Sequence, residues 1–181
     1  MKRALLEVMS RGVSARRFTR SLLRILRETE LCSIATVTPA RRAHISTAYF
    51  CFSPDLELYF LSHPLARHCR NLAHNRSMAM TVFRSSQPWG SRGVGLQLFG
   101  AGAEASGKHS AQAESAYAKR FPAYARWLAG RDRRSVQLRT HRFYRFLPRR
   151  IKILDERQFG DAVWVVASVR RGGGRRLPDQ S

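Results

Sequence analysis

Seven or eight short segments of the chain carry hydrophobic residues that alternate with polar ones or follow one another, as in β-strands. Within residues 43–52, the odd-numbered residues would face one side of a sheet and the even-numbered residues the other. Most segments are joined by turns of a few residues, so we expect neighbouring strands to pair antiparallel. The segments are residues 31–37, 43–52, 57–61, 77–83, 94–105, 136–146, 151–154 and 163–169.

Three further segments repeat their hydrophobic residues every three or four positions, as amphipathic helices do. The first follows Ser14, the second begins near Pro64, and the third spans residues 110–129 and is divided by Pro122. The expected buried faces are Phe18, Leu22, Ile25 and Leu26 in the first helix, Leu65, Cys69 and Leu72 in the second, and Tyr117, Phe121, Tyr124 and Leu128 in the third. These faces would pack against the strands.

The pattern predicts a mainly β protein of the α+β class, an antiparallel barrel with flanking helices. Closing the hairpin-linked strands into a barrel removes exposed edge strands. With 181 residues the chain can bury one core, and we expect one domain at residues 14–169. Residues 1–13 would form an N-terminal extension, and residues 170–181, with three consecutive glycines, a disordered basic tail.

The net charge of +21 raises the question of nucleic-acid binding, because phosphates attract clustered cations. The basic residues are spread over turns and chain ends, however, and all but four of the 33 are arginine, which indicates a general arginine bias. We therefore expect at most nonspecific binding of nucleic acid through the basic surface.

The three cysteines lie far apart and form no CxxC pair, which argues against a disulfide framework or a zinc site. The longest apolar run, residues 162–167, is too short to cross a membrane. A soluble protein in the reducing cytoplasm, with no membrane partner, is therefore expected.

The candidate chemistry lies within residues 58–100, where a strand ends and the second helix begins. Ser62 or His63 could cap the free amides of this helix, and Arg67 and His68 would lie in its first turn. Hydroxyl, amide and cationic groups together outline an anion site. The alternative is an ordinary strand-to-helix corner with a solvated basic face.

A polar, glycine-rich loop at residues 84–93 surrounds Trp89, and it would either border a ligand or form a mobile hairpin connection. Other catalytic signatures are missing, including HExxH, GxSxG, the phosphate-binding GxxxxGK[ST] and the Rossmann glycines. None of the 12 acidic residues is paired at an evident site, so carboxylate acid/base catalysis is not expected.

In the order of its elements and motifs, the chain resembles the pyridoxamine 5′-phosphate oxidase family, the FMN-binding split barrels. The family pattern Ser-Arg-Lys, three residues, Leu corresponds here to Ala66-Arg67-His68, three residues and Leu72. Residues 34–37 and 45–50 are similar to the paired strands of which the second lies along the flavin. Residues 95–100 match the family strand with a glutamine near a closing glycine. The similarity covers about residues 20–168.

This resemblance implies a cofactor, FMN, and a set of residues that hold it. Arg67 and His68 would bind the FMN phosphate with a hydroxyl from Ser62. The segment from Ser46 to Tyr49 would contact the flavin largely through its backbone. The complete set is Ser46, Thr47, Ala48, Tyr49, Ser62, Arg67, His68 and Gln97. Because a neutral imidazole has one donor where the family's lysine has three and a charge, Arg70 or an arginine of a partner chain would have to compensate for His68.

The resemblance further implies a homodimer with the flavin between subunits, because one small barrel has no cavity wide enough for an isoalloxazine ring. Exposed aromatic residues for such an interface are expected at Tyr49, Phe50, Phe52 and Trp89.

We expect a flavin-dependent oxidoreductase that acts on an unidentified small molecule. It would not be a true pyridoxamine phosphate oxidase, because the C-terminal Trp-Gln-Gly and Arg-x-His segment of those enzymes is not recognisable. The alternative is a split-barrel binding module that holds flavin, deazaflavin, haem or a polyanion without turnover.

Overall fold

The computed structural model describes residues 4–171, without the side chain of Arg134. Within these residues it has eight strands and six helices. In chain order they are β1 (Leu5–Val8), α1 (Ala15–Glu28), β2 (Leu31–Val37), β3 (Ala43–Phe52), β4 (Leu58–Ser62), α2 (Arg67–His74), β5 (Ser77–Phe83), β6 (Val94–Glu104), α3 (Lys108–Arg120), α4 (Pro122–Ala129), α5 (Arg133–Arg139), β7 (Arg142–Asp155), α6 (Glu156–Phe159) and β8 (Trp164–Arg170).

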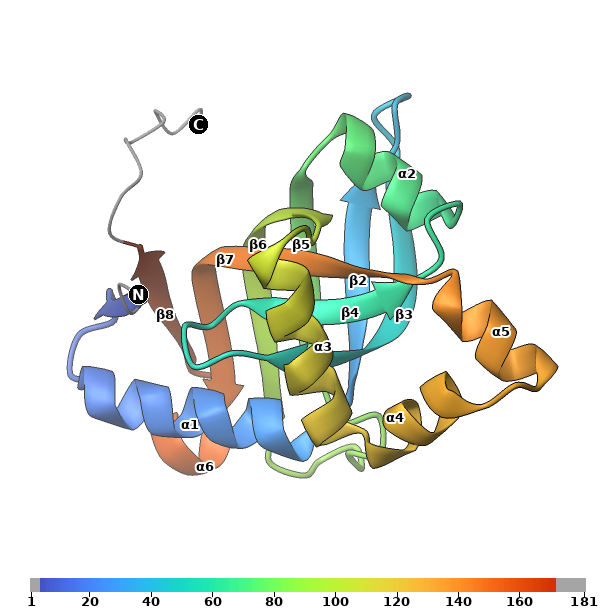
Figure 1. Cartoon of the computed structure of the whole chain (residues 1–181). Coiled ribbons are helices and arrows are strands. Elements are labelled where there is room, and N and C mark those ends of the chain that lie inside the picture. Colours follow the sequence, from blue (N-terminus) through green and yellow to red (C-terminus); the bar gives the residue numbers. More distant parts are fainter. Residues whose placement is uncertain (1–3, 172–181) are drawn as a thin grey trace.

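Six strands close an antiparallel barrel in the order β7-β4-β3-β2-β5-β6, with β6 pairing back onto β7 (Figure 1). Strand β7, with 14 residues, pairs with three other strands. The first part of β7 pairs with β4 and the last part with β8, while β6 follows it throughout. The expected α+β barrel with flanking helices is thus confirmed.

An irregularity in the pairing of β6 with β7 allows the long strand to bend. Phe99 is opposite Arg150 and Gly100 is opposite Pro148, so Arg149 is an extra residue in β7. A Cβ atom on Gly100 would lie 2.1 Å from the carbonyl oxygen of Leu147, so only glycine allows the two backbones to approach this closely.

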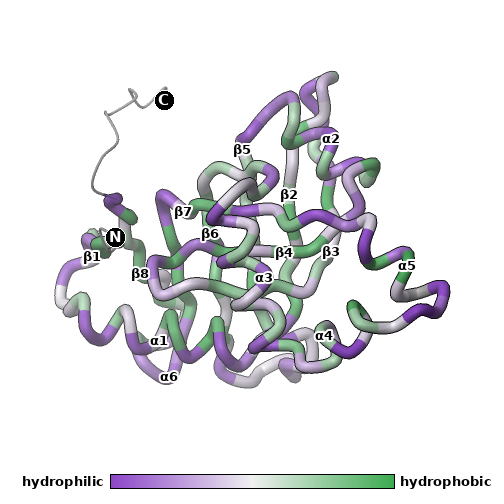
Figure 2. The backbone as a smooth tube through the Cα atoms, viewed as in Figure 1, coloured by the Kyte–Doolittle hydropathy of each residue, from purple (hydrophilic) through white to green (hydrophobic). Residues whose placement is uncertain are grey.

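The helices cover the two ends and one side of the barrel (Figure 1). Ser14 caps α1 by accepting a hydrogen bond from the Arg17 amide at 3.3 Å, and α1 lies across one end of the barrel. In Figure 2 the hydropathy alternates along α1, as expected for a helix with one buried face. Helix α2 lies at the other end, and α3 and α4 cover the outer side of β3, β4 and β7.

The hydrophobic core therefore has two parts. The larger part fills the barrel and includes Phe18, Phe50 and Phe60, all fully buried. The smaller part lies between the barrel wall and the third and fourth helices, around Tyr59 and Tyr117. No helix of residues 4–171 is long and apolar enough to cross a membrane.

The structure corrects several expected elements. Of the expected strand at residues 136–146, only residues 142–146 are in a strand, the start of β7. Helix α5 occupies Arg133–Arg139 with Asp132 as its cap, and β7 then continues unbroken to Asp155. The expected extension before residue 14 contains the strand β1, which pairs with β8. Of the expected tail, Arg170 ends β8, and residues 172–181 lie outside the described part of the chain.

The start of the second helix also differs from the prediction. Pro64 and Leu65 lie in a turn, and α2 begins only at Arg67. Leu65 is consequently 69% exposed, whereas Cys69 and Leu72 are buried as expected. The third residue on the buried face is Asn71, whose side-chain amide donates to the Thr36 hydroxyl at 3.0 Å.

Candidate functional site

One side of β3 lacks a neighbouring strand at the split of the barrel. β3 pairs with β2 through residues 43–49 but with β4 only through residues 50–52. Among the described residues, the side of 43–49 that faces away from β2 therefore has no strand partner, and we call it the β3 edge. Unpaired backbone N–H and C=O groups on such an edge are available to a ligand or to another chain.

Helix α2 begins beside this part of the barrel. The bond between Asn71 and Thr36 holds α2 against the end of β2 next to the β3 edge. Ala66 is the N-cap residue, and within the described chain no side chain caps the free amides. Arg67, the first helical residue, has an exposed side chain. Positive helix-terminal amides and a guanidinium group thus lie together, as an anion site requires.

The two expected capping residues have other partners. The imidazole Nδ1 of His63 accepts from the Leu65 amide at 3.2 Å, which stabilises the turn before α2. The Ser62 hydroxyl is hydrogen-bonded to Nε2 of His68 at 2.7 Å. Ser62 and His68 therefore do meet, but they bond to each other.

The side of β3 that faces the barrel interior carries polar residues at this end. The ring of His68 stacks on that of His44, with centroids 6.5 Å apart, and Thr36 is the register partner of His44. We call Thr36, His44, Ser62, His68 and Asn71 the inner polar cluster. It links the β3 edge, the end of β4 and the first turns of α2.

Burial, followed by the charge of His44, lowers the pKa of His68 below its usual value. His68 is therefore neutral near physiological pH. It offers no positive charge to a phosphate group, and its ring nitrogen is already bonded to Ser62.

Two buried polar atoms next to the β3 edge lack hydrogen-bond partners within the described residues. They are Nδ1 of His44 and the hydroxyl oxygen of Ser46, two residues further along the same face of β3. Because burying an unpaired polar group is costly, such atoms mark positions where a ligand or water would bind.

The outward side of β3, β2, β5 and β6 has a row of polar residues across four strands. Thr47 pairs with Ser33, Ser33 with Thr81, and Thr81 with Gln97. Three strand spacings of about 4.8 Å separate Thr47 from Gln97, or about 14 Å. Gln97 is therefore far from the β3 edge of its own chain.

Exposed apolar side chains flank this polar row. Ile45 is 70% exposed, and the others are Leu31, Tyr49, Phe83 and Phe99. We call this sheet surface, with its polar row, the outer face. Contiguous apolar groups of this kind mark interaction surfaces on soluble proteins. Phe50 is fully buried and Phe52 half-buried, so of the four aromatic residues expected at an interface only Tyr49 and Trp89 are exposed.

A cavity of about 380 Å³ adjoins the outer face beneath loop 84–93. Its lining includes Thr81, Phe83, Trp89, Gln97 and Trp164. Gln97 therefore lines a cavity that loop 84–93 also borders.

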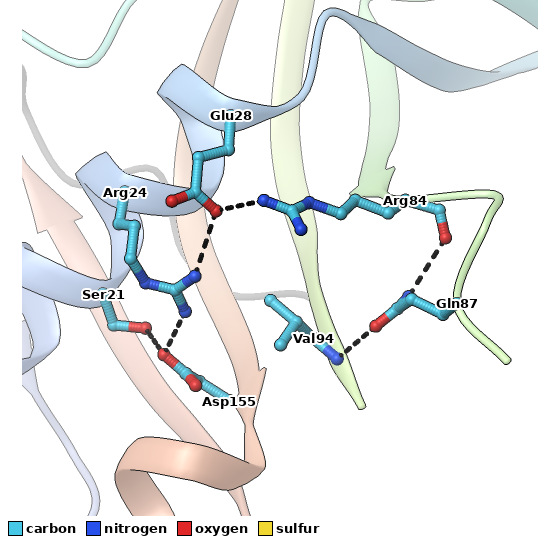
Figure 3. A network of polar contacts seen from close by, with 7 residues as sticks. All are labelled: Ser21, Arg24, Glu28, Arg84, Gln87, Val94 and Asp155. Atoms are coloured by element: carbon cyan, nitrogen blue, oxygen red, sulfur yellow. Dashed lines mark hydrogen bonds and ion pairs between the residues drawn. The ribbon is translucent and has the colours of Figure 1, made fainter. Parts of the chain in front are cut away.

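Hydrogen bonds fix the loop in place (Figure 3). Arg84 forms an ion pair with Glu28 of α1 at 2.6 Å, and Gln87 accepts from the Val94 amide at 2.7 Å. Glu28 also pairs with Arg24, which bonds to the buried Asp155 at 2.7 Å. These contacts tie both ends of the loop to α1 and to the start of β6.

The eight cofactor residues expected from the sequence fall into three places. Ser46, Thr47, Ala48 and Tyr49 lie on the β3 edge, Ser62, Arg67 and His68 lie where β4 leads into α2, and Gln97 lies apart on β6. Sequence reasoning missed Ser33, Thr81 and His44. The alternation of β2, β3 and β5 shows which face each occupies, but only the strand register shows what each adjoins. The described residues contain no cluster of three or more His, Cys, Asp or Glu side chains suited to a metal ion.

The sequence profile of one family, described as pyridoxamine 5′-phosphate oxidase, matches residues 18–155. This range contains all six barrel strands, β2 to β7, and leaves out β1 and β8. The chain belongs to the pyridoxamine 5′-phosphate oxidase family. Membership of the pyridoxamine 5′-phosphate oxidase family agrees with the split barrel and confirms the resemblance seen in the motifs. No curated protein sequence matches the chain.

Solved structures share the fold of this family member. A haem-binding protein from Mycobacterium smegmatis is 16% identical with a TM-score of 0.63, covering 88% of this chain and 59% of that one. Atu2129, a protein of unknown function from Agrobacterium tumefaciens, is 18% identical with a TM-score of 0.61, covering 80% and 60%. An FAD-binding protein from Mesorhizobium loti is 16% identical with a TM-score of 0.57, covering 91% and 99%. The chain thus spans about three fifths of the length of the first two.

Proposed function

We propose that this protein binds FMN along the β3 edge, with the phosphate at the first turn of α2. The observation that carries the proposal is the position of an unpaired strand edge beside an uncapped helix N-terminus with an arginine. FMN combines a planar ring, whose nitrogen and oxygen atoms can pair with backbone groups, and a phosphate that suits helix amides and a guanidinium group.

The polar groups around the edge fit such a ligand. The backbone of residues 46–49 is free on the side away from β2, and the unpartnered atoms of His44 and Ser46 adjoin it. Since His68 is neutral and bonded to Ser62, the charge that holds the phosphate comes from Arg67. Arg70, one helical turn further on, is the second exposed cation available.

A second copy of the chain would complete the site. The outer face begins at the β3 edge and exposes Ile45, Tyr49 and Leu31, so its contact with another copy would bury apolar surface. Gln97, too distant to reach the flavin of its own chain, would then contribute from the partner's side of a homodimer.

We further propose flavin-dependent oxidoreduction of a small molecule in the cytoplasm. Bound flavin supplies the redox chemistry, and the protein needs only to orient it and to admit a donor and an acceptor. Turnover of pyridoxamine 5′-phosphate should be negligible, because the basic and aromatic groups by which true oxidases hold this substrate were not recognised in the sequence. Specificity built on buried hydrogen bonds is lost when those bonds are missing.

Haem is the second candidate ligand, with deazaflavin as a variant of the first. The stacked pair of His44 and His68 beside the β3 edge favours haem, since imidazole is a common haem-iron ligand. The M. smegmatis protein with the same fold is described as haem-binding.

The absorbance spectrum of the purified protein, before and after addition of FMN or haemin, distinguishes these ligands. A flavin band that persists through gel filtration supports the proposal, whereas a Soret band with no flavin band favours haem. A stopped-flow screen of nicotinamide donors, following bleaching of the flavin band, then tests for turnover. Efficient production of pyridoxal 5′-phosphate in a parallel oxidase assay would contradict the proposed substrate class.

A further inference from the structure

A second cavity, of about 430 Å³, lies between the end of β6, the start of α3 and the middle of β7. It is lined by none of the eight residues expected to hold a cofactor. Its charged and titratable lining residues are Arg76, Glu104, His109, Arg145 and Arg149, and we call it the arginine cavity. The rest of the wall is formed by Ala101, Gly102, Ala103, Ala105, Ser106 and Leu147.

The three arginines reach this cavity from two places in the chain, Arg76 from the link between α2 and β5, and Arg145 and Arg149 from β7. Arg76 follows α2, and its carbonyl oxygen accepts from the Gly102 amide of β6 at 2.8 Å. Arg145 projects from β7 toward Glu57, which directly precedes β4, and the two form a partly buried ion pair. Arg149 is the extra residue of the bulge in β7, and bulges commonly redirect a side chain.

Positive charges outnumber negative ones among the residues that line this cavity and Glu57, the ion-pair partner of Arg145. Glu57 accepts hydrogen bonds from both Arg145 and Tyr59. Burial opposes ionisation of Glu57, but these bonds outweigh it and hold the pKa of Glu57 below its usual value. Glu57 is thus an anion that neutralises Arg145. Within residues 4–171, Arg76 and Arg149 take part in no ion pair, and Glu104 is the single acidic residue of the lining.

Two nitrogen atoms of the lining residues are buried and without hydrogen-bond partners among the described residues. They are Nε of Arg145 and Nδ1 of His109, and the latter lies 3.7 Å from a carboxylate oxygen of Glu57, beyond hydrogen-bond range. An unpaired buried donor on a guanidinium group is costly unless an acceptor fills the space. The arginine cavity therefore has cations at its rim, and two of its lining residues carry buried nitrogen atoms without a hydrogen-bond partner.

We propose that the arginine cavity binds the phosphate group of a small metabolite. Guanidinium groups bind phosphate oxygens in pairs of parallel hydrogen bonds, and two unpaired arginines match the double charge of a phosphomonoester better than a single carboxylate. The cavity is larger than a phosphate ion alone requires, and its alanine walls leave room for an uncharged organic part. This site is separate from the β3 edge and does not depend on flavin binding there.

Calorimetric titration of the full-length protein with inorganic phosphate, and with acetate as the singly charged comparison, tests this site. The double variant Arg76→Ala/Arg149→Ala removes two exposed side chains, and its thermal melt shows whether the fold persists. The control Arg20→Ala/Arg126→Ala changes the net charge equally at exposed positions elsewhere. A third protein, Arg67→Ala, tests whether phosphate binds at α2 instead.

We expect saturable binding of phosphate to the wild-type protein. The affinity should fall about tenfold or more in the cavity variant and stay the same in the control and in Arg67→Ala. Acetate should bind more weakly than phosphate. Absence of saturable phosphate binding, equal loss in the control, or loss in Arg67→Ala alone would each overturn the proposal. Loss in Arg67→Ala alone would leave the flavin site in place, so the two proposals can fail separately.

Discussion

Arg67 and His68 are adjacent in the chain, but only Arg67 carries a charge toward the surface. Replacing Arg67 by alanine should remove charge-assisted hydrogen bonds to the FMN phosphate, and affinity should fall about tenfold to a hundredfold for each bond lost. Fluorescence titration of FMN measures the change. The matched control is Arg20→Ala, an exposed arginine of α1 at the opposite end of the barrel. Unchanged affinity in the Arg67 variant would place the phosphate elsewhere.

The lowered pKa of His68 leads to a second prediction, on how the stability of the fold depends on pH. Between the folded-state pKa and the ordinary value of 6.5, the unfolded chain binds more protons than the folded one, so stability falls as pH drops through this range. Urea unfolding from about pH 8 to about pH 5 should show this loss in the wild type and less of it in His68→Gln. Identical slopes in the two proteins would show that His68 does not couple to folding.

At single residues, sequence reasoning succeeded where the neighbouring residues in the chain determine the local structure. The helix expected after Ser14 does begin at Ala15, because the start of a helix depends on the cap residue and the few residues that follow it. Leu65 was placed on a buried helix face, but the turn at Pro64 delays the helix by three residues. The unpartnered atoms of His44 and Ser46 could not be foreseen, because they depend on which strands fail to pair.

At the scale of elements, α1 is tied to the end of β7 by one buried carboxylate (Figure 3). Asp155 is fully buried and bonds to Ser21 and Arg24 of α1. Arg24→Ala would leave this charge without its cation, and we expect a loss of about 2–3 kcal/mol in unfolding free energy. Urea melts measure it, with Arg20→Ala on the same helix expected to change stability by under about 0.5 kcal/mol. Equal losses in the two variants would contradict a special role for the ion pair.

Several strand boundaries followed directly from the sequence, notably β2, β3 and β5, because short turns and alternation define hairpins. The first part of the expected strand at 136–146 was wrong, since Val136 and Leu138 belong to a short helix that Asp132 caps, and the strand begins only at Arg142. The free edge of β3 was also beyond sequence reasoning. It arises because β4 turns away after pairing with only three residues of β3, a feature of register rather than of composition.

At the scale of the whole molecule, the exposed outer face predicts a dimer. Ile45→Glu would place a charge in the middle of the expected contact, and sedimentation analysis should then show monomers where the wild type is dimeric. The matched control is Val136→Glu on α5, a position that is also exposed but lies away from the outer face. A wild-type protein that is monomeric at micromolar concentration while binding FMN tightly would contradict the shared site.

The barrel itself could be predicted from the sequence because hairpin-linked strands have few ways to protect their edges. The expected cofactor residues stay a prediction, with Ser46 to Tyr49 on β3 and Arg67 at the start of α2. The position of Gln97 relative to these residues could not be predicted, because its distance from β3 depends on the order of strands around the barrel.

Equilibrium titration of the wild-type protein with FMN, compared with haemin, tests the central claim most directly. Saturable binding of one FMN per chain is expected, with affinity lost together with the dimer in Ile45→Glu and retained in Val136→Glu. A folded protein that takes up haemin with a Soret band but binds no FMN would contradict flavin binding at the β3 edge.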